Sequence, residues 1–219
     1  MVEAVIFDMD GTLLDSQRVW DTLWAPALEP FGLVPDPGFV ADTRGTAGQA
    51  TLDVTHRYYG EDADAEGILK RAYDLADEYF CTTPVPLKEG SREILDYLGE
   101  KGVPCAVASS SPIHVINGAL GLAGIDGYFD HVVCTADVER PKPAPDIFLE
   151  AARRLASDPA CTIVVEDSFA GVMAARAGGF ISVMVPDMAQ PDESLDGQYD
   201  LLCESLLEVR DAIDEGRLG

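Results

Sequence analysis

Two aspartates near the N-terminus, Asp8 and Asp10, are the first residues in the chain whose type and spacing suggest chemistry. They follow the apolar run Val5-Ile6-Phe7, which fits one buried strand, and Gly11 after them allows a sharp turn. In open α/β sheets, ligands gather beyond the carboxyl ends of the strands, so both carboxylates are expected at the mouth of the fold. Carboxylate oxygens are ligands that Mg2+ prefers, and water and a substrate phosphate can complete its coordination.

Hydroxyl groups and a lysine follow later apolar segments. Ser109 and Ser110 come directly after the run 105–108 and before a predicted helix. Such serines form either an anion cradle together with free backbone N–H groups or, more commonly, a simple helix cap. Lys142 stands between two prolines, which fix the backbone around it, although an ordinary solvated loop lysine would have the same neighbours.

A second pair of acids, Glu166 and Asp167, follows the apolar run 162–165. Taken alone, these acids fit the start of a helix, whose N-terminal dipole favours negative charge, as well as they fit a cation site. The joint order distinguishes the two interpretations. An acid pair, a hydroxyl, a lysine and a second acid pair each follow an apolar strand in one chain, which favours a shared site for a cation and a phosphate.

The elements that must position these residues alternate between strand and helix from residue 83 onward. Apolar runs predict five main strands, with Leu201-Leu202 as the candidate for a last one, and helical crossovers connect them. This alternation predicts an α/β fold with a doubly wound, parallel, Rossmann-like sheet. Residues 1–16 and 83–219 are expected to form this catalytic core.

Residues 17–82 contain three segments with a helical period and are expected to form an inserted α-helical domain. Apolar stripes predict three helices, over 19–31, 47–59 and 64–81, and no strand. Gly32, followed by two prolines, is expected to end the first of them. The aromatic residues in this segment are interpreted mainly as helix packing.

Composition limits the classes of partner. The 15 basic and 39 acidic residues give a net charge of −24, which disfavours nucleic acid and anionic membranes as partners. The five cysteines lack metal-binding spacing, and no basic, leader-like segment is present, which together favour a reduced, cytoplasmic protein. No apolar run is long enough to span a membrane. The acid excess also suggests adaptation to high salt; melting temperatures that are equal in dilute buffer and in molar KCl would dismiss that hypothesis.

The order of these motifs closely resembles that of the haloacid dehalogenase superfamily. The resemblance covers nearly all 219 residues, because the segment 17–82 is similar to the helical cap that many members insert between their first and second motifs. The matching positions are Asp8, Asp10, Gly11 and Thr12 in the first motif, Ser109 in the second, Lys142 in the third, and Glu166 and Asp167 in the fourth.

The resemblance implies a role for each matching residue. Asp8 would attack phosphorus and form an aspartyl-phosphate, while Asp10 would protonate the leaving alcohol and later deprotonate the attacking water. A dehalogenase needs no such second acid, because halide leaves unprotonated. The resemblance further implies Mg2+ as cofactor, with Asp8, the Asp10 backbone carbonyl, Asp167 and, as a further candidate, Glu166 as its ligands. The phosphoryl oxygens would be bound by Met9, Ser109, Ser110 and Lys142.

Within the superfamily, the chain is similar to the beta-phosphoglucomutase and phosphoglycolate phosphatase subgroup. Where the mutases place a cap histidine this chain has Trp20, and where they carry an arginine for the second phosphate it has Gly48, with Arg44 earlier in the turn. These departures favour hydrolysis of a small phosphate monoester, such as a sugar phosphate, over a mutase reaction. The cap residues expected to contact the substrate are Trp20, Arg44, Thr46 and Gln49.

Three functions are therefore compared: a Mg2+-dependent phosphatase, a phosphosugar mutase that needs a bisphosphate activator, and a catalytically silent binding protein with the same fold. The expected partner is a small phosphate ester. The protein is expected to be a monomer, with a dimer as the alternative. All three interpretations require that the residues of the four motifs lie close together in the folded chain. A separation of more than about 10 Å between Asp8 and either Lys142 or Asp167 would contradict them, because no coordination sphere spans it.

Overall fold

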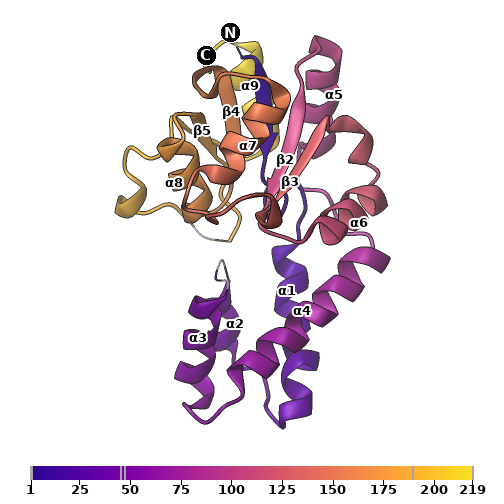
Figure 1. Cartoon of the computed structure of the whole chain (residues 1–219), viewed down its shortest axis with the longest axis vertical. Coiled ribbons are helices and arrows are strands. Elements are labelled where there is room, and N and C mark those ends of the chain that lie inside the picture. Colours follow the sequence, from indigo (N-terminus) through magenta and orange to yellow (C-terminus); the bar gives the residue numbers. More distant parts are fainter. Residues whose placement is uncertain (1, 45, 47, 189, 219) are drawn as a thin grey trace.

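A six-stranded parallel sheet is the centre of the computed structural model, which describes residues 2–44, 46, 48–188 and 190–218. The strand order is β3-β2-β1-β4-β5-β6, and Figure 1 shows the sheet in the upper part of the molecule. The predicted α/β architecture is confirmed, including the short last strand. The strands are β1 (Ala4–Phe7), β2 (Cys105–Ser109), β3 (His131–Cys134), β4 (Thr162–Glu166), β5 (Ile181–Met184) and β6 (Leu201–Leu202).

Strand β1 is fully buried and pairs on both sides, with β2 and with β4. Its register places Phe7 opposite Val107 of β2 and Val165 of β4. Because all strands run in the same direction, the residues that follow β1, β2 and β4 emerge at one edge of the sheet. The apolar runs of the sequence thus fix which polar residues meet there.

Helices cover both faces of the sheet. Val5 and Phe7 of β1 pack with residues of α5, α6 and α9, whereas Ile6 packs with residues of α7 and α8. This alternation follows from the two-residue repeat of a strand. The helices of this part are α5 (Ser91–Lys101), α6 (Ile113–Ala123), α7 (Asp146–Leu155), α8 (Phe169–Ala177) and α9 (Leu206–Asp214). Among the described residues, no helix is both long and apolar enough to cross a membrane.

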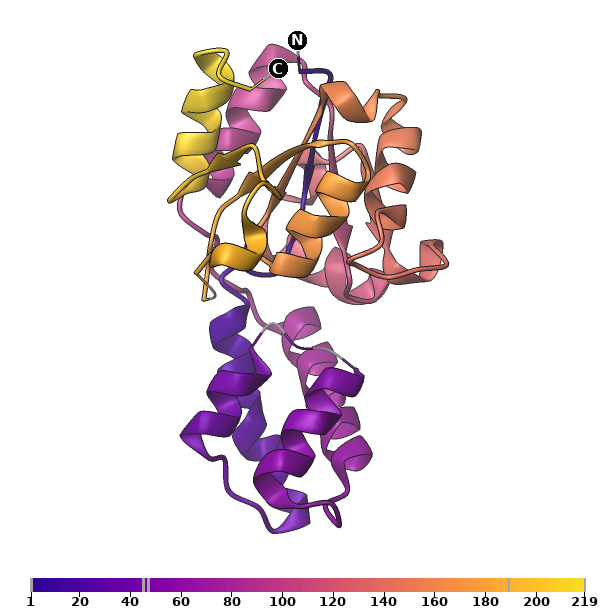
Figure 2. The ribbon, with the colours of Figure 1, turned by 90° about the vertical axis from the view of Figure 1, so that its left-hand side faces the viewer.

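Four further α-helices form a separate bundle at the carboxyl edge of the sheet (Figure 2). Its core contains Trp24, Phe39, Val54, Ile68 and Ala72. The assignment of residues 17–82 to a distinct cap domain remains a prediction about domain organisation. The bundle consists of α1 (Gln17–Leu28), α2 (Pro37–Thr43), α3 (Gln49–Tyr59) and α4 (Ala65–Thr82).

The prediction of only three helices in this segment is wrong, because α2 was missed. Pro37 looked like a helix breaker, but it occupies the first turn of α2, where a backbone N–H would have no partner within the helix. Asp36 caps the helix by accepting hydrogen bonds from the backbone N–H groups of Gly38 at 2.7 Å and Phe39 at 3.4 Å. The predicted start of the next helix, Ala47, lies outside the described residues.

The two segments that connect the sheet to the bundle lie side by side. The backbone N–H of Lys88 donates to the carbonyl of Leu13 at 2.9 Å, and the N–H of Asp15 donates to the carbonyl of Pro86 at 2.9 Å. The outgoing segment directly continues the loop that carries Asp10. The bundle is therefore attached through backbone hydrogen bonds beside the predicted site.

Candidate active site

Lys142 lies at the centre of a cluster of groups that come from four distant parts of the chain. Its Nζ is 2.6 Å from Asp8 Oδ1 and 2.7 Å from Glu166 Oε1, and it also donates to the carbonyl of Ala108 at 3.1 Å. The three side chains are each at least nine-tenths buried. The convergence expected from the sequence is thus present, and the distance limit set for Lys142 and Asp8 is met.

The loop that carries Lys142 is fixed by its own contacts. Arg140 makes two hydrogen bonds to the Asp146 carboxylate, at 3.1 and 2.6 Å, across the base of the loop. The Lys142 ammonium lies 4.8 Å from the centre of the Phe148 ring, within the range of a cation–π contact. Lys142 is therefore held in place by the protein and is not an ordinary solvated lysine.

Asp167 completes a group of three carboxylates. Oxygen atoms of Asp8, Glu166 and Asp167 lie within 4.8 Å of one another. Gly11 makes this arrangement possible, because it has a φ of +84° and a Cβ on it would lie 2.2 Å from Asp167 Oδ2. The residue at position 11 is thus small because Asp167, the acid directly after β4, packs against its backbone.

Both carboxylate oxygens of Glu166 already have donors. Oε1 accepts from Lys142, and Oε2 accepts from the backbone N–H and the hydroxyl of Ser168, each at 2.8 Å. Glu166 lies so close to the first turn of α8 that a Cβ on Gly171 would be 1.8 Å from Oε1. Ser168, which the sequence analysis did not assign a role, therefore fixes the acid that holds Lys142.

Electrostatics show that the cluster has more acid than base. Burial raises the pKa of Asp8 to about 8 despite the opposing charge of Lys142, and burial together with the neighbouring acids Glu166 and Asp8 raises the pKa of Asp167 well above its usual value. Burial alone would lower the pKa of Lys142, but Asp8 and Glu166 outweigh it and raise that pKa. One lysine thus faces three buried acids.

This donor set fits a hard divalent cation. Three clustered carboxylates whose charge is only partly compensated provide oxygen ligands alone, which is the environment that Mg2+ prefers. Within the described residues, no hydrogen-bond donor contacts Asp8 Oδ2 or the Asp167 carboxylate, whereas both oxygens of Glu166 have donors. Asp8 and Asp167 are therefore better suited to ligate a cation than Glu166.

Asp10 lies beside this cluster and is held by serines. Ser111 Oγ donates to Asp10 Oδ2 at 2.9 Å and Ser109 Oγ donates to the same oxygen at 3.3 Å. The backbone N–H of Ser111 also donates to Ser109 Oγ at 3.1 Å. The sequence analysis selected Ser109 and Ser110 but missed Ser111, although all three stand in one serine run.

Two of the predicted phosphate-binding residues have other contacts. The side chain of Met9 is fully buried in the hydrophobic core, so only its backbone can face a ligand. Ser110 is exposed, and its carbonyl accepts a hydrogen bond from Thr135 Oγ1 at 2.9 Å. Phosphate binding by these two residues remains a prediction.

The four predicted cap residues also have partners. Trp20 packs edge-on against Tyr73 at a centroid distance of 5.9 Å, and Arg44 makes two hydrogen bonds to Asp21, at 3.1 and 2.6 Å. Thr46 shares a hydroxyl hydrogen bond of 2.9 Å with Thr51, and Gln49 donates to Asp53 at 2.8 Å. Their contacts with a substrate remain predictions.

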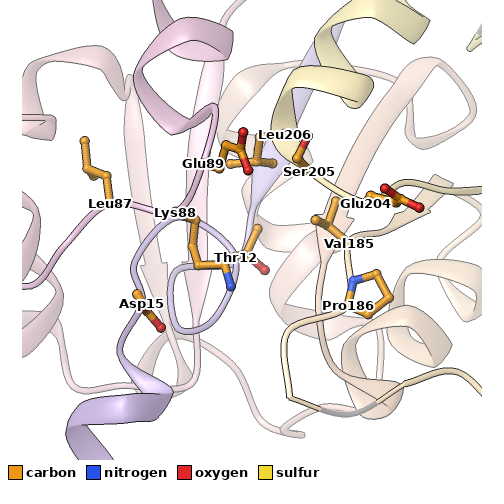
Figure 3. Close-up of a pocket in the computed structure, with 10 residues that line it drawn as sticks. All are labelled: Thr12, Asp15, Leu87, Lys88, Glu89, Val185, Pro186, Glu204, Ser205 and Leu206. Carbon is orange, nitrogen blue, oxygen red and sulfur yellow. The ribbon is translucent and has the colours of Figure 1, made fainter.

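A partly open cavity of about 190 Å3 lies beside the loop of the first motif (Figure 3). Thr12 and Asp15 line it from that loop, Lys88 from the returning segment, and Val185 and Pro186 from the end of β5. The cavity contains none of the clustered acids among its lining residues. It therefore adjoins the candidate site without being the catalytic cleft itself.

Comparisons with known proteins agree with this geometry. A family model described as haloacid dehalogenase-like hydrolase matches residues 2–179. Hexitol phosphatase B of Escherichia coli strain K12 is 28% identical over 215 residues, which cover 94% of this chain and 93% of the relative. Fructose-1-phosphate phosphatase YqaB of the same strain is 30% identical over 184 residues, which cover 83% of this chain and 95% of the relative.

A solved structure has the same architecture along its whole length. The crystal structure of a HAD family hydrolase from Deinococcus radiodurans R1, with bound phosphate and sodium, has a TM-score of 0.77 and 28% sequence identity. The match covers 99% of this chain and 97% of that chain. The likeness therefore includes the helical bundle as well as the sheet.

Proposed function

Because the chain belongs to the haloacid dehalogenase-like hydrolase family, we propose that it hydrolyses small sugar phosphates through an aspartyl-phosphate on Asp8, with Mg2+ as cofactor. Its family and its two phosphatase relatives make it a phosphoric monoester hydrolase. What we propose beyond this is that the substrate is a sugar phosphate, that the intermediate is an aspartyl-phosphate and that the cofactor is Mg2+. The observation that carries them is the position of Lys142 between Asp8 and Glu166, beside Asp167.

The cation would be held by the carboxylates of Asp8 and Asp167 and by the backbone carbonyl of Asp10. When bound, Mg2+ would offset the negative charges of the nucleophile and the phosphate, which otherwise repel each other. Glu166, both of whose oxygens already accept hydrogen bonds, would orient Lys142 and would not ligate the cation. Removing the cation with EDTA should therefore abolish activity.

The residues themselves account for two displacement steps. Asp8, whose Oδ1 is held by Lys142, would attack phosphorus as the bond to the alcohol oxygen breaks. Asp10, oriented by Ser109 and Ser111, would give its proton to the leaving alcohol and then take one from the water that attacks the aspartyl-phosphate. Ser109 and Lys142 would hold the phosphoryl oxygens as charge redistributes.

A direct assay separates the three candidate functions. The protein is incubated with Mg2+ and a panel of phosphorylated sugars and polyols, while free phosphate and isomer formation are followed in parallel. We expect release of phosphate without isomer. Isomer formation that needs a bisphosphate activator would indicate a mutase instead, and neither product from any member of the panel would indicate a binding protein.

The Asp21–Arg44 pair favours substrates with one phosphate. A mutase cap must bind a second phosphate, but Nε and Nη2 of Arg44 both donate to Asp21, whose carboxylate also offsets the charge of the arginine. We expect kcat/KM to be at least about tenfold higher for a sugar monophosphate than for the matching bisphosphate. The second phosphate of the bisphosphate would have no charge-assisted contact with Arg44.

The same pair provides the control for this prediction. Asp21→Asn releases Arg44, so the preference for the monophosphate should shrink. Asp42→Asn removes an acid from an exposed Arg57–Asp42 pair elsewhere in the bundle and should leave the preference unchanged. Equal kcat/KM values for the two substrates in the wild-type protein would contradict the argument.

Asp10→Asn tests the proton-transfer step. Steady-state turnover should fall by about 100- to 10,000-fold, the usual contribution of general acid–base catalysis. With p-nitrophenyl phosphate, whose leaving group needs no proton, the first step should survive and release a burst of one equivalent of p-nitrophenolate before the slow step. A variant that turns over at the wild-type rate, or that loses the burst together with turnover, would rule out this role for Asp10.

A further inference from the structure

A second lysine–acid pair lies next to the candidate site. Lys88 Nζ is 2.6 Å from Asp187 Oδ1, and the two side chains are only 22% and 8% exposed. Lys88 comes from the segment that returns from the bundle, and Asp187 follows the end of β5, one residue after Pro186. Figure 3 shows Lys88 reaching from that segment into the cavity that Thr12 also lines.

Asp187 adjoins the three-carboxylate cluster, because the backbone N–H of Val185, two residues earlier, donates to the carbonyl of Glu166 at 2.8 Å. Its charge is one of the causes, after burial and the two nearer acids, that raise the pKa of Asp167. It also contributes to raising the pKa of Arg44, after the nearer Asp21. Asp187 is not a member of the group whose oxygens lie within 4.8 Å of one another, so it stands outside that ligand group.

One oxygen of Asp187 remains without a partner. Lys88 binds Oδ1, whereas Oδ2 is buried and accepts no hydrogen bond from any residue that the structure describes. A buried carboxylate oxygen without a donor is costly in a folded protein. A positive charge nearby would offset that cost, and the three-carboxylate cluster is the place in the surroundings where the donor set calls for one.

We propose that Asp187, oriented by Lys88, is a positioning residue that raises the affinity of the Asp8–Asp167 site for its divalent cation. The inference rests on the proposed function, because it presupposes a cation at that site. Asp187 acts through its charge from outside the ligand set, as groups around metal sites commonly do. Lys88 keeps the carboxylate in one orientation and ties the end of β5 to the segment that returns from the cap.

Calorimetric titration of the whole, EDTA-treated protein with Mg2+ tests the proposal without relying on turnover. Asp187→Asn should weaken Mg2+ binding by about tenfold or more. Asp187→Glu keeps the charge and should bind Mg2+ nearly as tightly as the wild-type protein. Asp214→Asn is the matched control, because it removes the same charge from the exposed Lys101–Asp214 pair and should leave the affinity unchanged.

The outcomes separate this inference from the proposed function. Wild-type affinity in Asp187→Asn would overturn the inference, and so would an equal loss in Asp187→Glu, since that would indicate a packing role and not a charge effect. Failure of the wild-type protein to bind Mg2+ would instead overturn the cofactor assignment. Thermal melting in EDTA checks that each variant folds, and Asp187→Ser removes the same charge should the asparagine variant not fold.

Discussion

Asp8→Asn is expected to lower kcat for phosphate monoesters by at least about 10,000-fold, because an amide cannot replace a carboxylate as the attacking group. The asparagine retains the size of the side chain and an oxygen that can accept the Lys142 hydrogen bond now made by Oδ1. The loss should therefore appear in the chemical step and not in the fold. Release of p-nitrophenolate from p-nitrophenyl phosphate at saturating Mg2+ measures it.

Stability gives an independent control for this variant. Burial raises the pKa of Asp8 to about 8, so the folded protein disfavours the ionised carboxylate, and that cost grows as the pH rises from the unfolded value toward 8. A neutral asparagine avoids it. In EDTA at pH 8 the variant should melt no lower than the wild-type protein, and near-normal phosphatase activity in a folded Asp8→Asn protein would refute Asp8 as the nucleophile.

Lys142→Met is expected to lower both stability and turnover. Lys142 pairs with Asp8 and Glu166, two of the three clustered acids, and removing one partner of a buried ion pair costs about 3–5 kcal/mol. Loss of its contact with the phosphoryl oxygens should reduce kcat by a further factor of about 100 to 1,000. Urea unfolding and p-nitrophenyl phosphate assays measure the two effects separately.

The loss of stability should depend on conditions in a defined way. Saturating Mg2+ should reduce it, because the cation supplies positive charge to the same acids. It should also shrink as the pH falls below about 8, since Asp8 then takes up a proton and needs no counter-charge. Lys70→Met, in the exposed Lys70–Asp74 pair, is the control and should cost less than about 1 kcal/mol. A Lys142→Met protein as stable as this control would contradict the account.

The sheet and its acid-bearing edge could be predicted because the necessary signal is local. Apolar runs such as Val5-Ile6-Phe7 favour buried strands, and parallel strands bring the residues after them to one edge. That reasoning was enough to bring Asp8 and Lys142 together, although 134 residues separate them in the chain. The helix α2 was missed because Pro37 was interpreted as part of the end of the preceding helix, whereas it begins α2.

The supporting contacts could not be predicted, because nothing local encodes them. Arg44 looked available for a substrate phosphate, but its partner Asp21 lies 23 positions earlier on another helix. Lys88 and Asp187 are 99 positions apart, and neither stands in a recognisable motif. Ser111 and Ser168 stood in quoted stretches of sequence, yet which serine of a run contacts an acid depends on the turn that the backbone makes.

The paired connections between the sheet and the bundle link two parts of the molecule that serve different purposes. The loop from Asp8 to Asp15 carries two acids of the candidate site and is also the first of the two connections between the sheet and the bundle. The segment around Lys88 is the second connection. Any tilt of the bundle must pull on that loop. We therefore expect an insertion in either connection to displace the acids themselves.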